Sequence, residues 1–188
     1  MKSILKRFLL EHAELKGKKY GQGGNVKAYG IEIEWKGPFS LKKVIHEMDD
    51  CGKRPTWNGK DYGLYQIYGR HILCGKNTLL YVGKTTERTF SKRFKGHQQW
   101  LLKDQYEKDI KIYLGRIYNP KRHSQKDKWK SWKEDVGDAE KILIYKYSPN
   151  YNSRELAGIP KLHHPKFELF NGGRRGRLKN RDVPKDFL

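Results

Sequence analysis

The feature that most constrains this chain is a pair of short triplets that each join glycine to tyrosine. Gly63-Leu64-Tyr65 and Tyr81-Val82-Gly83 both lie in strand-like stretches, and residues 70–78 between them are rich in glycine and polar side chains. This arrangement is typical of a β-hairpin. It predicts two antiparallel strands that bring Tyr65 next to Tyr81. The pattern also fits two tyrosines that only pack against a sheet face, because tyrosine is common in strands.

Four polar residues follow the triplets at informative spacings, and they are Arg93, His97, Glu140 and Asn152. Arg93 and His97 are one helical turn apart, so they project from one face of a predicted helix and can reach a single phosphate. Together with the triplets, this order resembles the GIY-YIG nuclease superfamily. The spacing matches the type II restriction endonucleases of that superfamily, and the resemblance covers residues 62–152. Leu64 and Val82 stand where the family triplets carry isoleucine, and both are swaps of similar apolar volume.

The resemblance implies an α+β fold in which helices flank a small mixed or antiparallel three-stranded sheet. It also implies a metal-dependent endonuclease that cleaves double-stranded DNA. One Mg²⁺ (or Mn²⁺) ion per active site would be held by Glu140, with water filling the other positions, as Mg²⁺ allows. Lys84 directly follows the second triplet and offers a point charge to a phosphate. The predicted catalytic residues are therefore Tyr65, Tyr81, Lys84, Arg93, His97, Glu140 and Asn152.

Several roles stay open at this level. Arg88 competes with Arg93 for the phosphate, and Asn150 competes with Asn152. His97 has an ordinary pKa near neutrality and can move a proton, whereas a tyrosine needs help to act as a base. The general base is therefore either of the two triplet tyrosines or His97.

Glu140 has an ordinary structural alternative. Acidic residues favour the first turn of a helix, where they complement the helix dipole. Because the predicted helix spans residues 135–147, Glu140 could belong with Glu134, Asp135 and Asp138 to such an acidic beginning.

The charge of the chain indicates what kind of partner it binds. Its 41 Lys and Arg outnumber its 21 Asp and Glu, which gives a net charge of +20. So large an excess favours binding to a polyanion, and nucleic acid is the obvious one. The same charge, with five Trp and twelve Tyr for base stacking, also fits a binding protein without catalytic activity. The predicted DNA contacts outside the catalytic set are Arg88, Lys92, Lys95, Arg174, Arg175 and Arg177.

The remaining composition favours a cytoplasmic protein with no membrane partner and no small-molecule cofactor. The two cysteines lack metal-ligand spacing, and no stretch has the roughly 18 apolar residues of a membrane span. We expect an N-terminal helix, arm and lead-in segment (1–60), a catalytic core (61–155) and a basic C-terminal extension (156–188). Cleavage of a palindromic site favours a homodimer. A small phage or mobile-element nuclease of the same superfamily would look similar.

Periodicity and capping signals place the other elements. The expected helices span residues 3–16, 41–50, 89–103 and 135–147, with Ser40 as an N-cap. The expected strands outside the hairpin span residues 29–35, 108–117 and 167–170.

Overall fold

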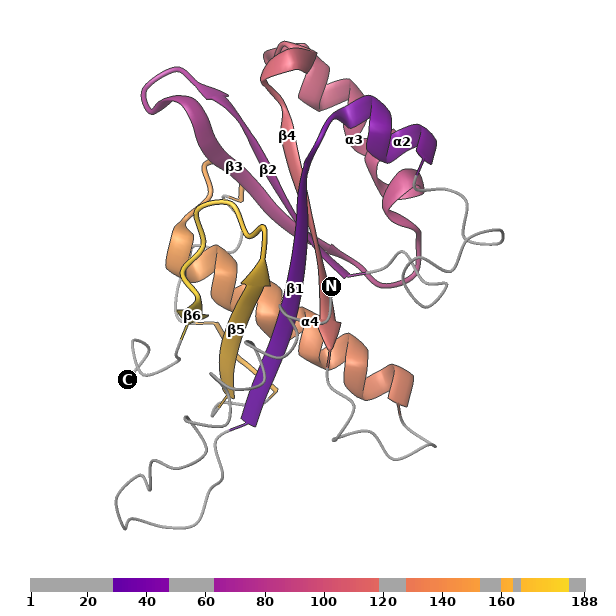
Figure 1. Ribbon diagram of the computed structural model, residues 1–188, viewed down its shortest axis with the longest axis vertical. Coiled ribbons are helices and arrows are strands. Elements are labelled where there is room, and N and C mark those ends of the chain that lie inside the picture. The colour runs from indigo at the N-terminus through magenta and orange to yellow at the C-terminus, as the bar shows by residue number, and fades with distance from the viewer. Residues whose placement is uncertain (1–28, 48–62, 119–127, 153–159, 164–166, 183–188) are drawn as a thin grey trace.

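The computed structural model describes residues 29–47, 63–118, 128–152, 160–163 and 167–182, so the predicted helix over 3–16 lies outside the described residues. The described chain is α+β, with one mixed sheet in the order β3-β2-β4-β1-β5-β6 (Figure 1). The strands are β1 (Tyr29–Phe39), β2 (Gly63–His71), β3 (Gly75–Thr85), β4 (Lys111–Tyr118), β5 (Phe167–Gly173) and β6 (Arg181–Asp182).

The sheet has six strands, so the expected three-stranded sheet is too small. An antiparallel unit β3-β2-β4 does lie at one side of it. The additional strands come from both ends of the chain: β1 pairs antiparallel with β4 and parallel with β5, which pairs with β6. The pairing of β1 with β5 joins segments more than a hundred residues apart, and local sequence patterns carry no information about it.

The hairpin of β2 and β3 forms as the two triplets predict. Its turn occupies residues 72–74, and Gly75 adopts the positive φ of 78° that glycine tolerates best. The register shifts between Ile67 and Tyr68, which leaves Leu80 as an extra residue on β3. A bulge of this kind reverses the face to which the following side chains point. Tyr81 and Leu79 therefore face opposite sides of the sheet.

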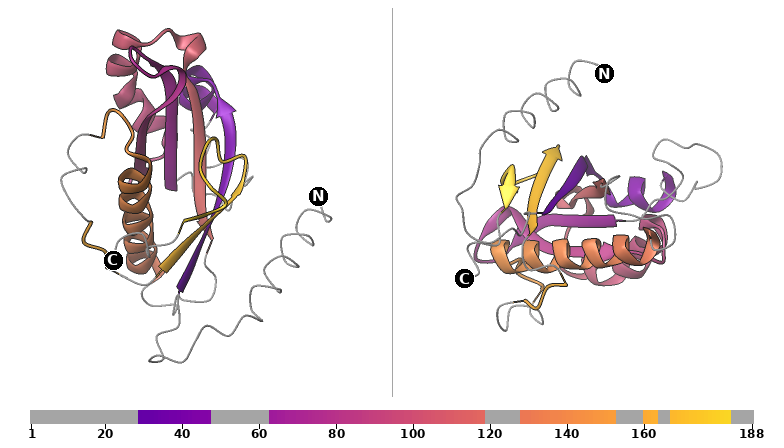
Figure 2. Two further views of the ribbon diagram at one scale, coloured as in Figure 1. Left: turned by 90° about the vertical axis from the view of Figure 1, so that its left-hand side faces the viewer. Right: turned by 90° about the horizontal axis from the view of Figure 1, so that it is seen from below.

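Helices cover the sheet on both faces, and each face has its own core (Figure 2). On one face, α2 (Leu41–Glu47) and α3 (Phe90–Asp104) pack against Tyr65, Ile67 and Ile112. On the other face, α4 (Lys128–Tyr147) packs its apolar side against Leu64 and Val82. Strand β2 is buried on both faces from Gly63 to Gly69, which explains its nearly continuous run of apolar and aromatic residues.

Most element boundaries agree with the sequence patterns. Ser40 caps α2 by accepting a hydrogen bond from the Lys43 backbone, and Thr89 caps α3 through Lys92. The main difference is α4, which begins at Lys128, about two turns before the predicted start at residue 135. The added turns carry Lys and Trp instead of a clear apolar stripe, so periodicity alone does not mark them.

The C-terminal extension is part of the same structure. The Asn171 amide donates to Asp182 at 2.8 Å, and the Tyr147 hydroxyl on α4 donates to the same carboxylate at 2.9 Å. The loop after β5 is held to β2, because the Arg177 backbone donates to the Tyr68 hydroxyl at 2.9 Å. Within the described ranges, no helix is long and apolar enough to cross a membrane.

Candidate active site

The two tyrosines of the triplets lie side by side on the face covered by α3. Tyr65 is paired with Gly83 and Tyr81 with Ile67, and the two phenol rings are stacked with centroids 6.0 Å apart. The glycine is required by this packing. A Cβ at Gly83 would lie 2.5 Å from Cζ and Oη of Tyr65 and 2.6 Å from Cε1 of Tyr81. The second triplet therefore ends in glycine because the ring of the first triplet lies over its backbone.

Helix α3 brings Arg93 and His97 to the same hydroxyl group. The Nε of Arg93 donates to the Tyr65 oxygen at 3.1 Å, and Nε2 of His97 lies 2.8 Å from that oxygen. His97 and Tyr65 are both buried, whereas Arg93 and Tyr81 are half-buried. Arg93 and His97, which the sequence places one helical turn apart, thus both contact the hydroxyl oxygen of Tyr65.

This environment shifts the pKa values of Tyr65 and His97. Burial raises the pKa of Tyr65, Tyr81 raises it further, and Arg93 acts in the opposite direction; Glu140 also raises this pKa, which places its carboxylate in the electrostatic field of the tyrosine. Burial, reinforced by Arg93, lowers the pKa of His97 to about 4. His97 is therefore neutral at physiological pH.

Lys84 and Glu140 lie on the other face of the hairpin, because Lys84 is paired with Leu64, which packs against α4. Lys84 is next to the second triplet on β3, and its Nζ lies 2.8 Å from Oε2 of Glu140 on α4. The carboxylate is largely buried, and the lysine side chain is 38% exposed. Because α4 begins at Lys128, Glu140 is about three turns into the helix, and the first turn carries no acid. The helix-dipole explanation for this glutamate therefore does not apply.

A single carboxylate is a small donor set, and it fits one kind of metal. In the described part of the chain, no group of three or more His, Cys, Asp and Glu side chains could hold an ion. Mg²⁺ keeps several waters and is bound through one or two carboxylates together with substrate phosphates, so Glu140 beside a bound phosphodiester fits it.

Asn152 acts on the backbone of β3. Its Oδ1 accepts from the Val82 amide at 2.9 Å and its Nδ2 donates to the Val82 carbonyl at 2.8 Å, so the side chain holds the centre of the second triplet. Asn150, the alternative residue, donates its side-chain amide to the exposed Cys74 sulfur at 3.8 Å. The structure therefore brings Asn152, and not Asn150, to the triplet.

The predicted DNA contacts fall into two separate groups. Arg88 is exposed just before α3, and Lys92 and Lys95 are exposed in its first two turns, close in sequence to Arg93. It is Arg93 that reaches the Tyr65 hydroxyl, whereas the backbone carbonyl of Arg88 accepts from the Thr85 hydroxyl. The structure therefore brings Arg93, and not Arg88, to the tyrosines.

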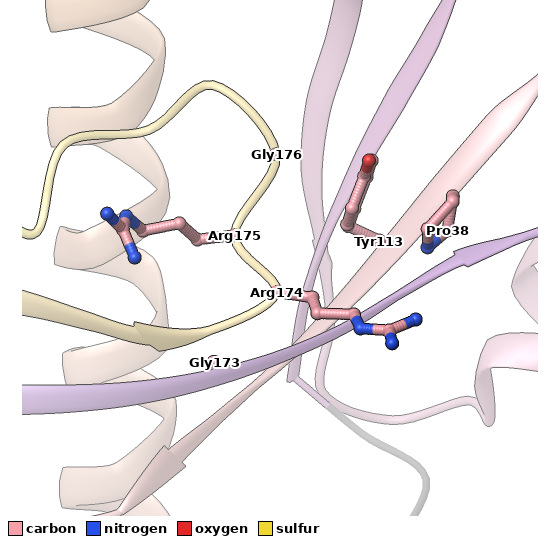
Figure 3. Close-up of a pocket in the computed structure, with 6 residues that line it drawn as sticks. All are labelled: Pro38, Tyr113, Gly173, Arg174, Arg175 and Gly176. Atoms are coloured by element: carbon pink, nitrogen blue, oxygen red, sulfur yellow. The ribbon is translucent and has the colours of Figure 1, made fainter.

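The second group, Arg174, Arg175 and Arg177, lies on the opposite face of the sheet from Tyr65. The backbone amide of Arg177 donates to the Tyr68 hydroxyl, which in turn donates to Gln66. Neighbouring residues of a strand point to opposite faces, so Gln66 and Tyr65 lie on opposite faces of the sheet. Figure 3 shows Arg174 and Arg175 pointing in different directions from a surface pocket of about 440 Å³ beside Tyr113. The three arginines are thus outside the tyrosine cluster.

Trp100 is a site residue that the sequence patterns did not single out. It lies one turn after His97 on α3, and its Nε1 donates to Nδ1 of His97 at 2.8 Å. Its ring also lies 5.9 Å from Tyr81 and 5.8 Å from Tyr151, centroid to centroid. The spacing of three residues from a candidate catalytic histidine is the signal that could have found it.

Comparisons of the chain with protein-family models, with curated proteins and with solved structures find no match in any of the three. A function must therefore be inferred from the geometry of the chain's own residues.

Replacing Gly83 with Ala is expected to destabilise the fold by about 1 to 3 kcal/mol, because the added methyl group would displace the rings of Tyr65 and Tyr81. Thermal and urea unfolding would measure the loss. The matched control is Gly96→Ala on α3, where no atom lies within 4 Å of the new Cβ. That variant should be as stable as the wild type or slightly more stable, since alanine favours helices. Equal behaviour of the two variants would contradict the close packing at Gly83.

His97 should make stability depend on pH. Its pKa of about 4 lies below the reference value of 6.5, so the unfolded chain takes up the proton first as pH falls. The stabilisation is fully present above pH 6.5 and is lost towards pH 4, by at most about 3 kcal/mol. Urea unfolding across this range should give a flatter curve for His97→Gln than for the wild type.

Proposed function

We propose that this protein is a metal-dependent endonuclease that hydrolyses phosphodiester bonds in double-stranded DNA, and that it is a sequence-specific type II restriction enzyme. The observation that carries the proposal is the convergence of Arg93 and His97 on the Tyr65 hydroxyl beside Tyr81. The Lys84–Glu140 pair lies on the α4 face of the same strands, and the carboxylate of Glu140 acts electrostatically on Tyr65. The strands β2 and β3 and the helices α3 and α4 supply these residues. The antiparallel unit β3-β2-β4 with α3 and α4 on its two faces supports the resemblance to the GIY-YIG superfamily.

The residues divide into groups that suit in-line phosphoryl transfer. Glu140 would hold a divalent ion, which when bound supplies Lewis-acid polarisation of the scissile phosphate. Arg93 offers a planar guanidinium to the charge that develops on the equatorial oxygens. Lys84 is half-exposed beside the carboxylate and can turn from Glu140 to a nonbridging oxygen. Tyr81 is half-buried and would offer its hydroxyl to the nucleophile or the phosphate, whereas Tyr65 is fully buried beside it and held by Arg93 and His97.

Asn152 contributes indirectly. Its two hydrogen bonds fix the backbone of Val82, and that backbone connects Tyr81 to Gly83. Asn152 therefore holds in place both Tyr81 and Gly83, the glycine that lies under the ring of Tyr65. This makes Asn152 a positioning residue.

The expected partners belong to the same proposal. A net charge of +20 favours double-stranded DNA, and the exposed Arg88, Lys92 and Lys95 would extend the contact from the site along the backbone. A homodimer would present two equivalent sites to the two strands of a palindrome. A cytoplasmic location is part of the proposal as well.

Incubation of the purified protein with plasmid and genomic DNA, in Mg²⁺ and in EDTA, tests the proposal. Discrete bands that need Mg²⁺ support a sequence-specific endonuclease, and Mn²⁺ should replace Mg²⁺. A smear that needs the metal would support a nonspecific nuclease, such as a phage or mobile-element enzyme. A retarded band with intact DNA under all conditions would overturn catalysis and leave a nucleic-acid-binding protein.

Neutralising Arg174, Arg175 and Arg177 together by substitution with Gln is expected to weaken DNA binding and flatten its salt dependence. The slope should fall by roughly one unit for each lost phosphate contact. A salt titration of binding would measure it, and sequencing of cut ends would detect any base contact. Because these arginines form hydrogen bonds with Trp35, Gly37, Tyr68 and Leu178, all outside the proposed catalytic residues, cleavage of bound DNA should continue. An equal loss of charge at the exposed Lys42, Lys43 and Lys103 is the control. If both triple variants keep the slope and the cut sites of the wild type, the cluster has no role in DNA recognition.

A further inference from the structure

The contact between Trp100 and His97 determines where the imidazole proton lies. An indole N–H is a donor only, so Nδ1 of His97, at 2.8 Å from Trp100 Nε1, must accept. A neutral imidazole carries one proton on one of its two nitrogens. Since Nδ1 accepts, the proton is on Nε2.

That proton is directed at Tyr65. The Tyr65 oxygen lies 2.8 Å from Nε2, and it also accepts from Nε of Arg93 at 3.1 Å. His97 is held neutral, because burial and Arg93 together lower its pKa to about 4. The phenol oxygen therefore receives two hydrogen bonds, one from each residue of the α3 pair.

We propose that Trp100 is a positioning residue of the site, which fixes His97 in the tautomer that donates to Tyr65. With Nδ1 engaged by the indole and Nε2 protonated, the imidazole has no lone pair left for the attacking water. His97 is then a hydrogen-bond donor that steadies the Tyr65 oxygen, and it is not the general base. The effect on cleavage rests on the proposed function, whereas the tautomer itself does not.

The sharpest test replaces one atom. Site-specific incorporation of 3-benzothienylalanine at Trp100 puts sulfur in place of the indole N–H and keeps the shape of the ring. The matched control is the same substitution at Trp35, whose Nε1 donates to Asn171 at 2.9 Å in the core on the other face of the sheet. Each variant loses one hydrogen bond from a tryptophan, but only the bond from Trp100 is made to His97. Trp100→Phe is a second variant that needs no unnatural amino acid.

The first readout is the ¹⁵N spectrum of the histidine rings in the metal-free, DNA-free protein, with His97 assigned through His97→Gln. The wild type and the Trp35 analogue should show a protonated Nε2 and an unprotonated Nδ1. The Trp100 analogue should show a mixture of tautomers, and its His97 should titrate at a higher pH than in the wild type. A protonated Nδ1 in the wild type, or an unchanged tautomer in the analogue, would overturn the proposal.

The second readout is single-turnover cleavage in Mg²⁺. Loss of the Trp100 N–H should slow cleavage by about tenfold, the scale of one net hydrogen bond, while the Trp35 analogue keeps the wild-type rate. Unchanged cleavage with a changed tautomer would overturn the positioning role of Trp100. If the wild type does not cleave DNA but its tautomer is as expected, the proposed function fails and the assignment of the His97 proton stands.

Discussion

Glu140→Gln is expected to slow DNA cleavage by about 10³-fold or more while DNA binding stays intact or becomes tighter. The amide keeps the size of the side chain and can still accept a hydrogen bond from Lys84. It removes the negative charge that would hold the metal, and metal stabilisation of the transition state amounts to several kcal/mol. Binding survives because the basic surface is unchanged.

Single-turnover cleavage and a binding assay on the same DNA would separate the two effects. Glu134→Gln is the matched control, since this glutamate lies earlier on α4 and is half-exposed, and it is Glu140 that pairs with Lys84. The control should cleave at the rate of the wild type. Cleavage by Glu140→Gln at a rate near that of the wild type would remove Glu140 as the metal ligand, whatever the binding assay shows.

Tyr65→Phe is expected to slow the chemical step by on the order of 10²-fold or more, and Tyr81→Phe should have an effect of the same order. For Tyr65 the reason is geometric. Its oxygen accepts from Arg93 and lies against Nε2 of His97, so phenylalanine leaves two donors without their acceptor. Leaving buried donors unpaired also costs about 1 to 3 kcal/mol of stability.

Tyr68→Phe controls for that loss of stability. Tyr68 is on the same strand, is buried, and loses a hydrogen bond to Gln66 and one from Arg177, but it faces the opposite side of the sheet. This variant should unfold more easily and still cleave DNA at the wild-type rate once folded. Normal cleavage by both Tyr65→Phe and Tyr81→Phe would mean that these tyrosines only pack the sheet.

The local part of this architecture could be predicted from the sequence. The hairpin, the cap at Ser40 and the position of Arg93 and His97 on one face of α3 all depend on residues close together in the chain. At such short separations, turn-forming residues and helical spacing determine the structure. The same locality explains why Arg93 and Arg88 could not be distinguished. Which arginine reaches Tyr65 depends on the angle at which α3 crosses β2, and no local pattern encodes that angle.

The long-range part could not be predicted. The Lys84–Glu140 pair and the attachment of Asn152 to Val82 join residues 56 to 70 positions apart, and they depend on how α4 and the turn after it lie against β3. The pairing of β1 with β5 escaped prediction for a similar reason, because parallel pairing between distant segments has no signature in either segment. The beginning of α4 was missed because its first turns are too polar to show an apolar stripe.

The clamp on Val82 also limits how copies of this protein can associate. Strand β3 is an outer strand of the described sheet, and the middle of its outward backbone is already occupied: Asn152 binds both backbone groups of Val82, and Tyr151 donates to the Leu80 carbonyl at 2.8 Å. At the far side of the described sheet, β6 has only two residues. An exposed outer strand is a template for strand addition and fibrous aggregation. The middle of β3 is therefore closed to the addition of a strand from a second copy of the chain.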